Sequence, residues 1–440
     1  MTDEKLANLS DDGKAFLRFV DAATSPYHAV AAASAALRAA GFSELALGAP
    51  WMLAAGGNYF VNVYDGALLA FTVGGKGPLR MAAAHTDFPT FRLKAEADAA
   101  SEAPYAMVNV EPYGGMIYRT WLDRPLGVAG KIVTQGKDAF HPETHLVDCH
   151  EPVMTIPSLA IHMDRDVNKK GELNAQKDMM PIAALPPETA RADWWLEKIQ
   201  GGRAFGEVLS YDLMAYPLEQ GCTFGYDHEL LSSPRLDNMT SVWACVQGLI
   251  AAAQAGAPDG VRLIALFDNE EVGSRTKQGA GSAVLMEVLR RIYASAAVAP
   301  DDAADAEERL MTALADGFLL SCDVAHGTHP SHVAKMDPYV HPQLGAGVVL
   351  KQAASQRYAG DAEAIAIVRA LCEAHAIPCQ TFVNRSDTPG GATLGSIASA
   401  LVPVRTMDVG VPILAMHSAR ETMGTADEAA LTALVHAVLE

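Results

Sequence analysis

The sequence predicts an α/β protein: a central mixed, largely parallel β-sheet with helices on both faces, interrupted by a β-rich insert. Helices and strands alternate from residue 237 onward, which is typical of parallel strands joined by crossover helices. The stretch from about 95 to 235 is instead rich in Pro, Gly and His and has little helical periodicity. The simplest division is a discontinuous α/β domain of residues 1–94 and 236–440 around an insert of residues 95–235.

The first part of the predicted α/β domain begins with helix and continues with strands. Apolar residues recur at helical spacing over 13–41, where Ser25-Pro26 breaks the helix and Gly41 ends it. Residues 58–72 alternate between apolar and polar as strands do, and the apolar run 79–84 leads directly to His85.

The second part repeats a helix-then-strand pattern. We expect helices over 240–256, 280–296 and 361–377, strands over 261–268, 317–323, 379–383 and 413–417, and a last helix after them. Such repetition places strand ends at one edge of a sheet, where open α/β sheets bind their ligands.

Composition narrows the function classes. The 440 residues are 50% hydrophobic and 19% charged, as in globular proteins, and the net charge of −19 argues against binding nucleic acid or an anionic membrane surface. Six cysteines without a CxxC pair fit a reducing compartment. An acidic, polar N-terminus and the lack of a long apolar run lead us to expect a cytoplasmic protein with no membrane segment.

Residues able to bind metal follow four apolar runs and precede one helix. They are His85, the pair Glu270-Glu271, Asp323, His417 and, before the helix, Asp237. Taken singly, each has an ordinary structural explanation, such as a helix cap or a solvated helix start. Their recurrence at the ends of successive strands favours a shared site.

This donor set suits a pair of divalent ions, since imidazole and carboxylate together favour Zn, Co or Mn. Asp87, two residues after His85, is placed to orient the imidazole. Within the pair Glu270-Glu271, one carboxylate can bind metal while the other serves as a general base, and the residues alone leave open which does which. The sequence lacks HExxH, GxSxG and P-loop motifs, which argues against serine hydrolases and NTPases.

The chain resembles the M18 aspartyl aminopeptidases, a family of dinuclear zinc metallopeptidases, along nearly its whole length. The most specific segments are FDNEEVGS at 267–274 and DVGVPILAMHSARETMG at 408–424, supported by AAHTDFPTFRLK at 83–94 and SPRLDN at 233–238. The order and number of these segments make a chance similarity improbable.

The resemblance implies a role for each candidate. Asp237 would bridge two metal ions, most simply Zn²⁺, with Mn²⁺ or Co²⁺ left open at one site. His85 and Asp323 would hold one ion, and Glu271 and His417 the other. The remaining roles fall to Glu270 as the general base, Asp87 as the residue that orients His85, and His162 as an oxyanion-stabilising residue that reaches a neighbouring subunit's site.

The implied reaction is hydrolysis of an acidic N-terminal residue, Asp or Glu, from a peptide by a water that the two metal ions activate. The resemblance also implies a homo-oligomer, a tetrahedral dodecamer built from dimers, with the insert as the dimerisation domain. Two alternatives stay open: the same metal site acting on neutral N-terminal residues or as an amino-acid deacylase, and an inactive relative that serves as an assembly protein.

Two departures from the family pattern bear on specificity. Gly390 stands where many relatives have cysteine, and Ala346 stands where some have a lysine able to bind an acidic side chain. A preference for acidic substrates therefore needs another basic group, for which we consider Arg385, Lys335, Lys351 and Lys94. Arg385 is the leading candidate because it lies between an apolar strand and a Gly-rich loop.

Overall fold

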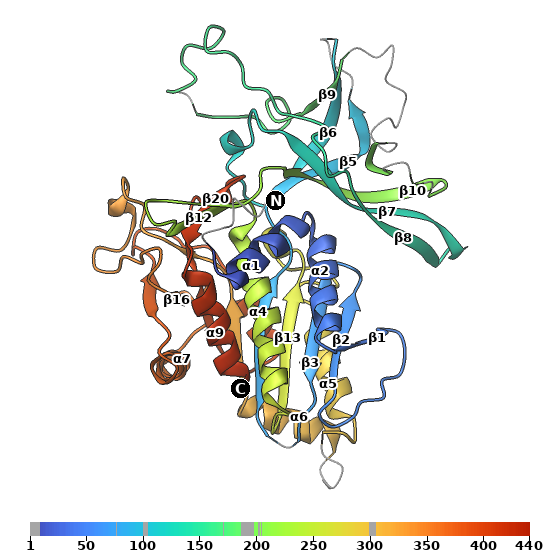
Figure 1. The fold of residues 1–440 in the computed structure, drawn as a ribbon, viewed down its shortest axis with the longest axis vertical. Helices are drawn as coiled ribbons and strands as arrows, with labels where there is room; N and C mark the ends of the chain where they lie inside the picture. The colour runs from blue at the N-terminus through green and yellow to red at the C-terminus, as the bar shows by residue number, and fades with distance from the viewer. Residues whose placement is uncertain are drawn as a thin grey trace. The chain divides into compact units, whose positions relative to one another are not determined.

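The computed structural model describes residues 9–75, 77–99, 104–169, 171–185, 198–200, 203, 205–298 and 305–440, apart from the side chain at 98. The chain forms two compact units (Figure 1). The first comprises Met1–Asp87, Gly221–Met416 and Glu421–Glu440, and the second comprises Phe88–Gln220 and His417–Arg420. The predicted division after 94 and 235 differs from these boundaries, because residues 221–235 belong to the first unit and residues 88–94 to the second.

A nine-stranded mixed sheet forms the centre of the first unit. In spatial order its strands are β1 (Ser43–Leu45), β2 (Asn58–Val63), β3 (Ala67–Thr72), β13 (Val261–Phe267), β4 (Leu79–His85), β14 (Phe318–Cys322), β18 (Arg405–Gly410), β16 (Val348–Gln352) and β17 (Cys379–Val383). The block β13-β4-β14-β18 is parallel, whereas β3 and β16 run antiparallel to their neighbours in this block. The predicted mixed, largely parallel sheet is confirmed.

Helices cover both faces of this sheet. They are α1 (Asp11–Ala22), α2 (Pro26–Ala39), α4 (Leu236–Ala255), α5 (Val284–Tyr293), α6 (Ala306–Ala315), α7 (Ala362–Ala374), α8 (Leu394–Leu401) and α9 (Asp427–Leu439). Met81 and Ala83 of β4 pack in a buried cluster with α5, α6 and α8, while α4 and α9 contact the same strand and lie in front of the sheet in Figure 1. The predicted break at Ser25-Pro26 is confirmed, since the Ser25 side chain caps α2.

The predicted strand over 413–417 does not join the central sheet. Its apolar residues form β19 (Pro412–Leu414) in a separate five-stranded sheet with β11 (Cys222–Phe224), β12 (Leu230–Ser233), β20 (Glu421–Gly424) and β15 (Ala325–His326). The place beside β14 is taken by β18. The chain leaves the central sheet after Gly410, where a side chain would collide with the backbone oxygen of Asp323.

The second unit contains an antiparallel six-stranded sheet of its own. Its order is β8 (His141–Asp148), β7 (Leu126–Asp138), β10 (Val208–Pro217), β5 (Thr90–Ala99), β6 (Ala106–Tyr113) and β9 (Ile182–Ala184). A separate buried cluster that includes Phe91, Trp121 and Ile132 lies on this sheet. This unit corresponds to the predicted β-rich insert.

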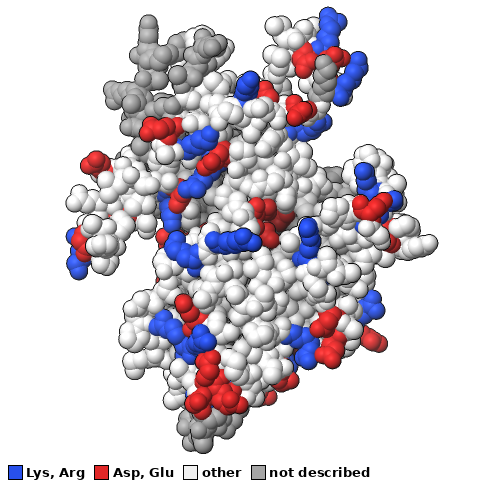
Figure 2. Space-filling model, turned by 180° about the vertical axis from the view of Figure 1, so that it is seen from behind, with Lys and Arg blue, Asp and Glu red and all other residues white. Residues whose placement is uncertain are grey.

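The surface mixes both signs of charge. On the face shown in Figure 2, Lys and Arg side chains are interspersed with Asp and Glu side chains. None of the helices in the described ranges has the length and hydropathy that crossing a membrane requires.

Glu428 makes folding stability depend on pH. Burial raises its pKa from an ordinary value of 4.5 to about 8, although Thr432 Oγ1 donates a 2.9 Å hydrogen bond to it. Between these pH values the unfolded chain loses a proton that the folded chain keeps, so stability falls as pH rises toward 8. We expect Glu428→Gln to raise the free energy of unfolding at pH 8 by about 4 kcal/mol, and with it Tm, and to change stability little at pH 4.5.

Thermal unfolding of both proteins at several pH values measures this difference. Glu373→Gln on the exposed side of α7 is the control, because Glu373 is solvated. An equal Tm change for Glu428→Gln at pH 4.5 and pH 8 would contradict the assignment.

Candidate metal centre

Polar residues lie at or just after the ends of three strands of the first unit, at one edge of the central sheet. His85 is the last residue of β4 and pairs in register with Phe267, the last residue of β13. Glu270 follows β13 in the 3₁₀ turn η3 (Glu270–Val272), and Asp323 directly follows β14. Because β13, β4 and β14 are parallel, their carboxyl ends meet at this edge, as in other open α/β sheets.

His85 lies between two carboxylates. Its Nε2 is 3.5 Å from Asp237 Oδ1 and 3.5 Å from Asp323 Oδ1, and all three side chains are buried. Asp237 lies at the start of α4, in a kink where its own backbone angles are not helical (φ −81°, ψ 104°), so its carboxylate does not come from a strand end. One ligand atom from each of these three residues lies within 4.8 Å of the others.

The pair Glu270-Glu271 lies next to the same imidazole. His85, Glu270 and Glu271 each offer a ligand atom within 4.8 Å of the other two. The predicted candidates of the first unit, His85, Asp237, Glu270, Glu271 and Asp323, are thus brought together at one edge of the sheet.

Asp87 connects the imidazole with the Glu270-Glu271 turn. Its Oδ1 is 3.3 Å from His85 Nδ1, and its backbone oxygen is 3.0 Å from the same nitrogen. Its carboxylate also accepts hydrogen bonds from two backbone amides, Glu270 N at 3.0 Å and Glu271 N at 3.1 Å. Asp87 therefore fixes the ring and the turn together, which is more than orientation of His85 alone.

The carboxylates change the protonation of their neighbours. Burial disfavours the charged form of His85, but hydrogen bonds with Asp237, Asp323 and Asp87 raise its pKa well above the ordinary range. Burial raises the pKa of Glu270 to about 8; His85 opposes this shift and nearby carboxylates add to it. The cluster thus concentrates negative charge that a cation can neutralise.

Lys351 is buried beside Asp323 and is bonded to it. Its Nζ donates to the backbone oxygen of Asp323 at 3.1 Å, to Asp323 Oδ2 at 3.4 Å and to Val324 O at 3.2 Å. Burial alone raises the pKa of a carboxylic acid, but Lys351 and His85 lower that of Asp323. Lys351, predicted to bind substrate, is therefore held in the structure by a predicted metal ligand.

Two further residues position Asp237 and its neighbour. The buried carboxylate of Glu421 accepts a hydrogen bond from Asp237 N at 3.0 Å, and Asn238 Nδ2 donates to Cys322 O at 3.0 Å. Sequence reasoning missed both roles. The only signal was their place inside the quoted segments 408–424 and 233–238, because the contact between Asp237 and Glu421 spans 184 residues of sequence.

The donor set fits a divalent metal ion. One imidazole and several carboxylates, all buried or half-buried, converge within a few ångströms, and the backing groups are a carboxylate and an ammonium that fix donor orientation. Outer partners of this kind are typical of metal sites in proteins. Oxygen and nitrogen donors without thiolate favour Zn²⁺, Co²⁺ or Mn²⁺.

Two predicted residues belong to the second unit. His417 begins the segment His417–Arg420, and its Nδ1 is 2.9 Å from Gly115 O, so its role as a metal ligand stays a prediction. His162 is exposed in a turn, next to Ile161 and Met163, which are 51% and 75% exposed. A buried structural role for His162 is thereby excluded.

Among the predicted basic substrate-binding residues, Lys351 contacts the cluster through Asp323, whereas the hydrogen bonds of Arg385 and Lys94 are made with other residues. Arg385 is half-exposed and donates to both carboxylate oxygens of Asp387, at 2.7 and 3.0 Å, and to Ala334 O. Lys335 is exposed at the end of the 3₁₀ turn η4 (Val333–Lys335), and Lys94 in the second unit donates to Gln176.

The glycine turn around Ala346 is hydrogen-bonded to the carboxylate of Asp427. Gly345 N and Gly347 N donate to the Asp427 carboxylate at 2.7 and 2.8 Å. Both glycines have positive φ, which a side chain would disfavour. A carboxylate thus anchors the loop in which some relatives have a lysine.

Comparison with known proteins gives one family. The family model described as "Aminopeptidase I zinc metalloprotease (M18)" matches residues 19–438. The "Probable M18 family aminopeptidase 2" of Clostridium acetobutylicum is 40% identical over 96% of this chain and 97% of its own length. "Aspartyl aminopeptidase 4" of Saccharomyces cerevisiae is 36% identical over 95% of this chain and 92% of its own length.

Solved structures agree with this result. A cryo-EM structure of the Ape4 and Nbr1 complex contains a chain that matches with a TM-score of 0.89 and 30% identity, over 97% of this chain and 85% of that one. Fold, family model and relatives therefore agree along the whole length. The chain belongs to the M18 family of zinc metalloproteases and is an aminopeptidase, a hydrolase that removes residues from the N-terminus of peptides.

Proposed function

We propose that this chain is an aspartyl aminopeptidase that uses two divalent metal ions, most simply Zn²⁺, and Glu270 as its general base. The observation that carries the proposal is the cluster of His85, Asp237, Asp323 and Glu271 around one sheet edge, with Glu270 beside it. In this assignment Asp237 would be shared by the two ions, His85 and Asp323 would hold one, and Glu271 and His417 would hold the other.

The residues of the chain divide the catalytic work. When bound, the metal ions supply Lewis acidity and lower the pKa of water. Glu270 takes a proton from the attacking water and transfers it to the leaving amine. Asp87 holds Glu270 and Glu271 through their backbone amides, so that both carboxylates keep their orientation. Lys351 holds Asp323 by donating hydrogen bonds to its backbone oxygen and to its carboxylate.

We infer that His162 acts on a neighbouring copy of the chain. It is exposed and lies beside the exposed apolar residues Leu159, Ile161 and Met163, a composition typical of a surface that another protein covers. A tetrahedral dodecamer built from dimers agrees with this inference. Light scattering of the purified protein tests it, since a monomer would exclude a role for His162 in another subunit's site.

Acidic specificity is the finer part of the proposal. It is supported by the aspartyl aminopeptidase name of the yeast relative, which shares 36% of its residues with this chain. Arg385 is the proposed side-chain receptor, because its side chain is 38% exposed and already binds a carboxylate, that of Asp387. A substrate carboxylate would replace Asp387 in this pair.

Hydrolysis of aminoacyl substrates tests the function. Metal-loaded protein is assayed with N-terminal Asp, Glu, Leu, Lys and Ala, and with N-acetylated amino acids. We expect kcat/KM for Asp or Glu to exceed the other values. Preference for Leu or Ala would contradict acidic specificity, turnover of the acetylated compounds alone would indicate a deacylase, and no turnover with metal bound would favour an inactive assembly protein.

A further inference from the structure

A second cavity lies at the opposite end of the strands that carry the metal centre. It has a volume of about 470 Å³ and lies in the first unit, where β4, β13, β14 and β18 begin. The metal-binding candidates follow the carboxyl ends of β4, β13 and β14, so the cavity is separated from them by the length of a strand. Its volume is in the range of cavities that bind small molecules.

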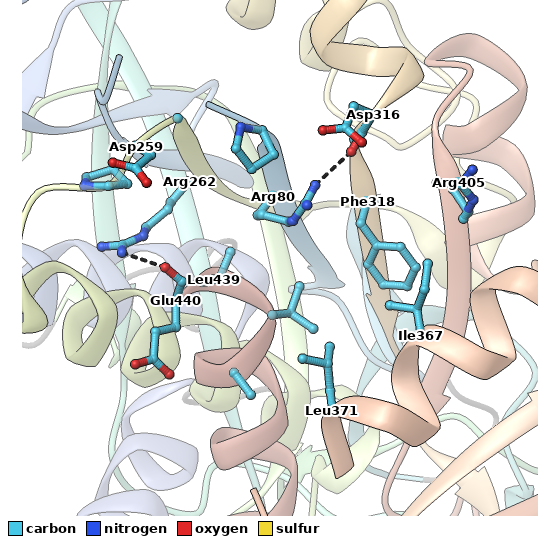
Figure 3. Close-up of a pocket in the computed structure, with 16 residues that line it drawn as sticks. Arg80, Asp259, Arg262, Asp316, Phe318, Ile367, Leu371, Arg405, Leu439 and Glu440 are labelled. Atoms are coloured by element: carbon cyan, nitrogen blue, oxygen red, sulfur yellow. Dashed lines mark hydrogen bonds between the residues drawn. The ribbon is translucent and has the colours of Figure 1, made fainter. Parts of the chain in front are cut away.

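Strand register places three arginines in one row beside this cavity. Arg262 of β13 pairs with Arg80 of β4, Arg80 pairs with Phe318 of β14, and Phe318 pairs with Arg405 of β18. Registered residues of neighbouring parallel strands point to the same face, about 4.8 Å apart. In Figure 3 Arg80 stands between Arg262 and Arg405. We call this cavity the arginine-row pocket.

The outer two arginines, Arg405 and Arg262, bind a carboxylate and backbone carbonyl oxygens, respectively. Arg405 forms an ion pair with Glu363 at 3.1 Å. Arg262 is 6% exposed and donates to Ala252 O, Gly256 O and Glu440 O. Among the described residues, the buried Nε of Arg262 has no hydrogen-bond partner.

The middle arginine, Arg80, donates to backbone oxygens and is repelled by the positive charge of Arg405. Both hydrogen bonds of Arg80 leave from Nη1, to Asp316 O at 2.8 Å and to Leu79 O at 3.3 Å. Burial lowers the pKa of Arg80; Asp316 opposes this effect and Arg405 adds to it. An anion on the Nε–Nη2 edge would offset this repulsion and would use the geometry in which guanidinium binds carboxylate.

The pocket also has apolar lining. Phe318, in register with Arg80 and Arg405, is buried, and Ile367 and Leu371 of α7 line the cavity below the arginine row in the view of Figure 3. The exposed carboxylates of Asp259, Asp316 and Glu440 also lie on the lining. These three carboxylates disfavour a multiply charged anion such as phosphate, whereas the apolar lining favours a ligand with a hydrocarbon tail.

We propose that the arginine-row pocket binds a small organic monoanion, a carboxylate held by Arg80 with an apolar tail against Phe318, Ile367 and Leu371. This site is distinct from the metal centre and does not depend on the proposed peptidase specificity. The carboxylate takes two donors of the Arg80 guanidinium, and the tail removes apolar surface of α7 and β14 from water.

Calorimetric titration of the full-length, metal-loaded protein with octanoate tests this proposal. We expect saturable binding with a Kd below about 1 mM, and much weaker binding of octanol, acetate and inorganic phosphate. Arg80→Met should weaken octanoate binding by about tenfold or more through loss of the bidentate pair. Arg290→Met, at an exposed arginine that pairs with Glu307, is the matched control and should leave binding unchanged.

A second variant covers the case in which Arg80→Met fails to fold. Ile367→Asp changes a half-buried helix residue and places a negative charge beside the tail, so it should also abolish octanoate binding. The kcat/KM of both variants should stay within about twofold of wild type, because the change lies at the far end of the strands. Octanoate binding that is equal in wild type and both variants, or absent from wild type, would overturn the proposal.

Discussion

Replacing Glu270 with glutamine should lower kcat by about 10²- to 10⁴-fold while the protein keeps its metal. Glutamine has nearly the same size and keeps the backbone amide that Asp87 binds, so the turn should stay in place. It cannot accept the proton that the attacking water must lose. The loss should therefore appear in kcat and leave KM nearly unchanged, because substrate binding does not use this proton.

Glu271→Gln is the matched comparison, and it decides between the two roles that the sequence left open. If Glu271 is the ligand, elemental analysis should find less metal in its variant than in wild type. The variant should regain part of its activity when metal is added in excess. Glu307→Gln, at an exposed ion pair with Arg290, controls for loss of a surface carboxylate. Loss of metal from Glu270→Gln and full metal content in Glu271→Gln would reverse the assignment.

The strand ends of the central sheet could be predicted from sequence because each combines two local signals. The run before His85 is apolar on both faces, as a buried parallel strand must be, and it stops at a polar residue. The same holds for β14 and Asp323. These signals depend only on neighbouring residues, so His85 and Asp323 could be expected at one edge of the sheet before any contact was known.

The run before His417 carries the same local signal and was interpreted wrongly. The apolar run Ile413–Met416 resembles the other strands, yet the chain uses β18 in the central sheet and turns away after Gly410. Sheet membership depends on pairing with residues far apart in sequence, which a single segment does not encode. For the same reason the predicted domain boundaries differ from the compact units, since β12 within residues 221–235 pairs with β20 near the C-terminal end of the chain.

The contacts around the metal ligands could not be predicted either. Lys351 could be expected to bind substrate because it is basic and lies in a quoted segment, but its burial against Asp323 depends on the pairing of β16 with β18. Asp87 was expected to orient His85, and its bonds to the Glu270 and Glu271 amides span more than 180 residues. Sequence therefore indicates the metal-binding and catalytic residues. It indicates less readily the residues that hold those side chains in position.

Asp87→Asn should weaken metal binding by about 10- to 100-fold and lower kcat even when metal is in excess. The carboxylate of Asp87 accepts from Glu270 N on Oδ1 and from Glu271 N on Oδ2. An asparagine amide has one acceptor, so one buried N–H would face an NH₂ group and lose its partner, at a cost of about 1–3 kcal/mol. The turn that carries both glutamates would then shift.

The two parts of this effect are separated by titrating activity with metal. Weaker binding alone moves the midpoint to higher metal concentration and leaves the plateau at the wild-type kcat, whereas a displaced Glu270 also lowers the plateau. Asp361→Asn is the matched control, because Asp361 also accepts from a backbone amide, Ala364 N at 2.8 Å, at the start of α7. It should lower Tm and leave both midpoint and plateau unchanged. A wild-type midpoint and plateau in Asp87→Asn would show that His85 and the Glu270-Glu271 turn hold their positions without this carboxylate.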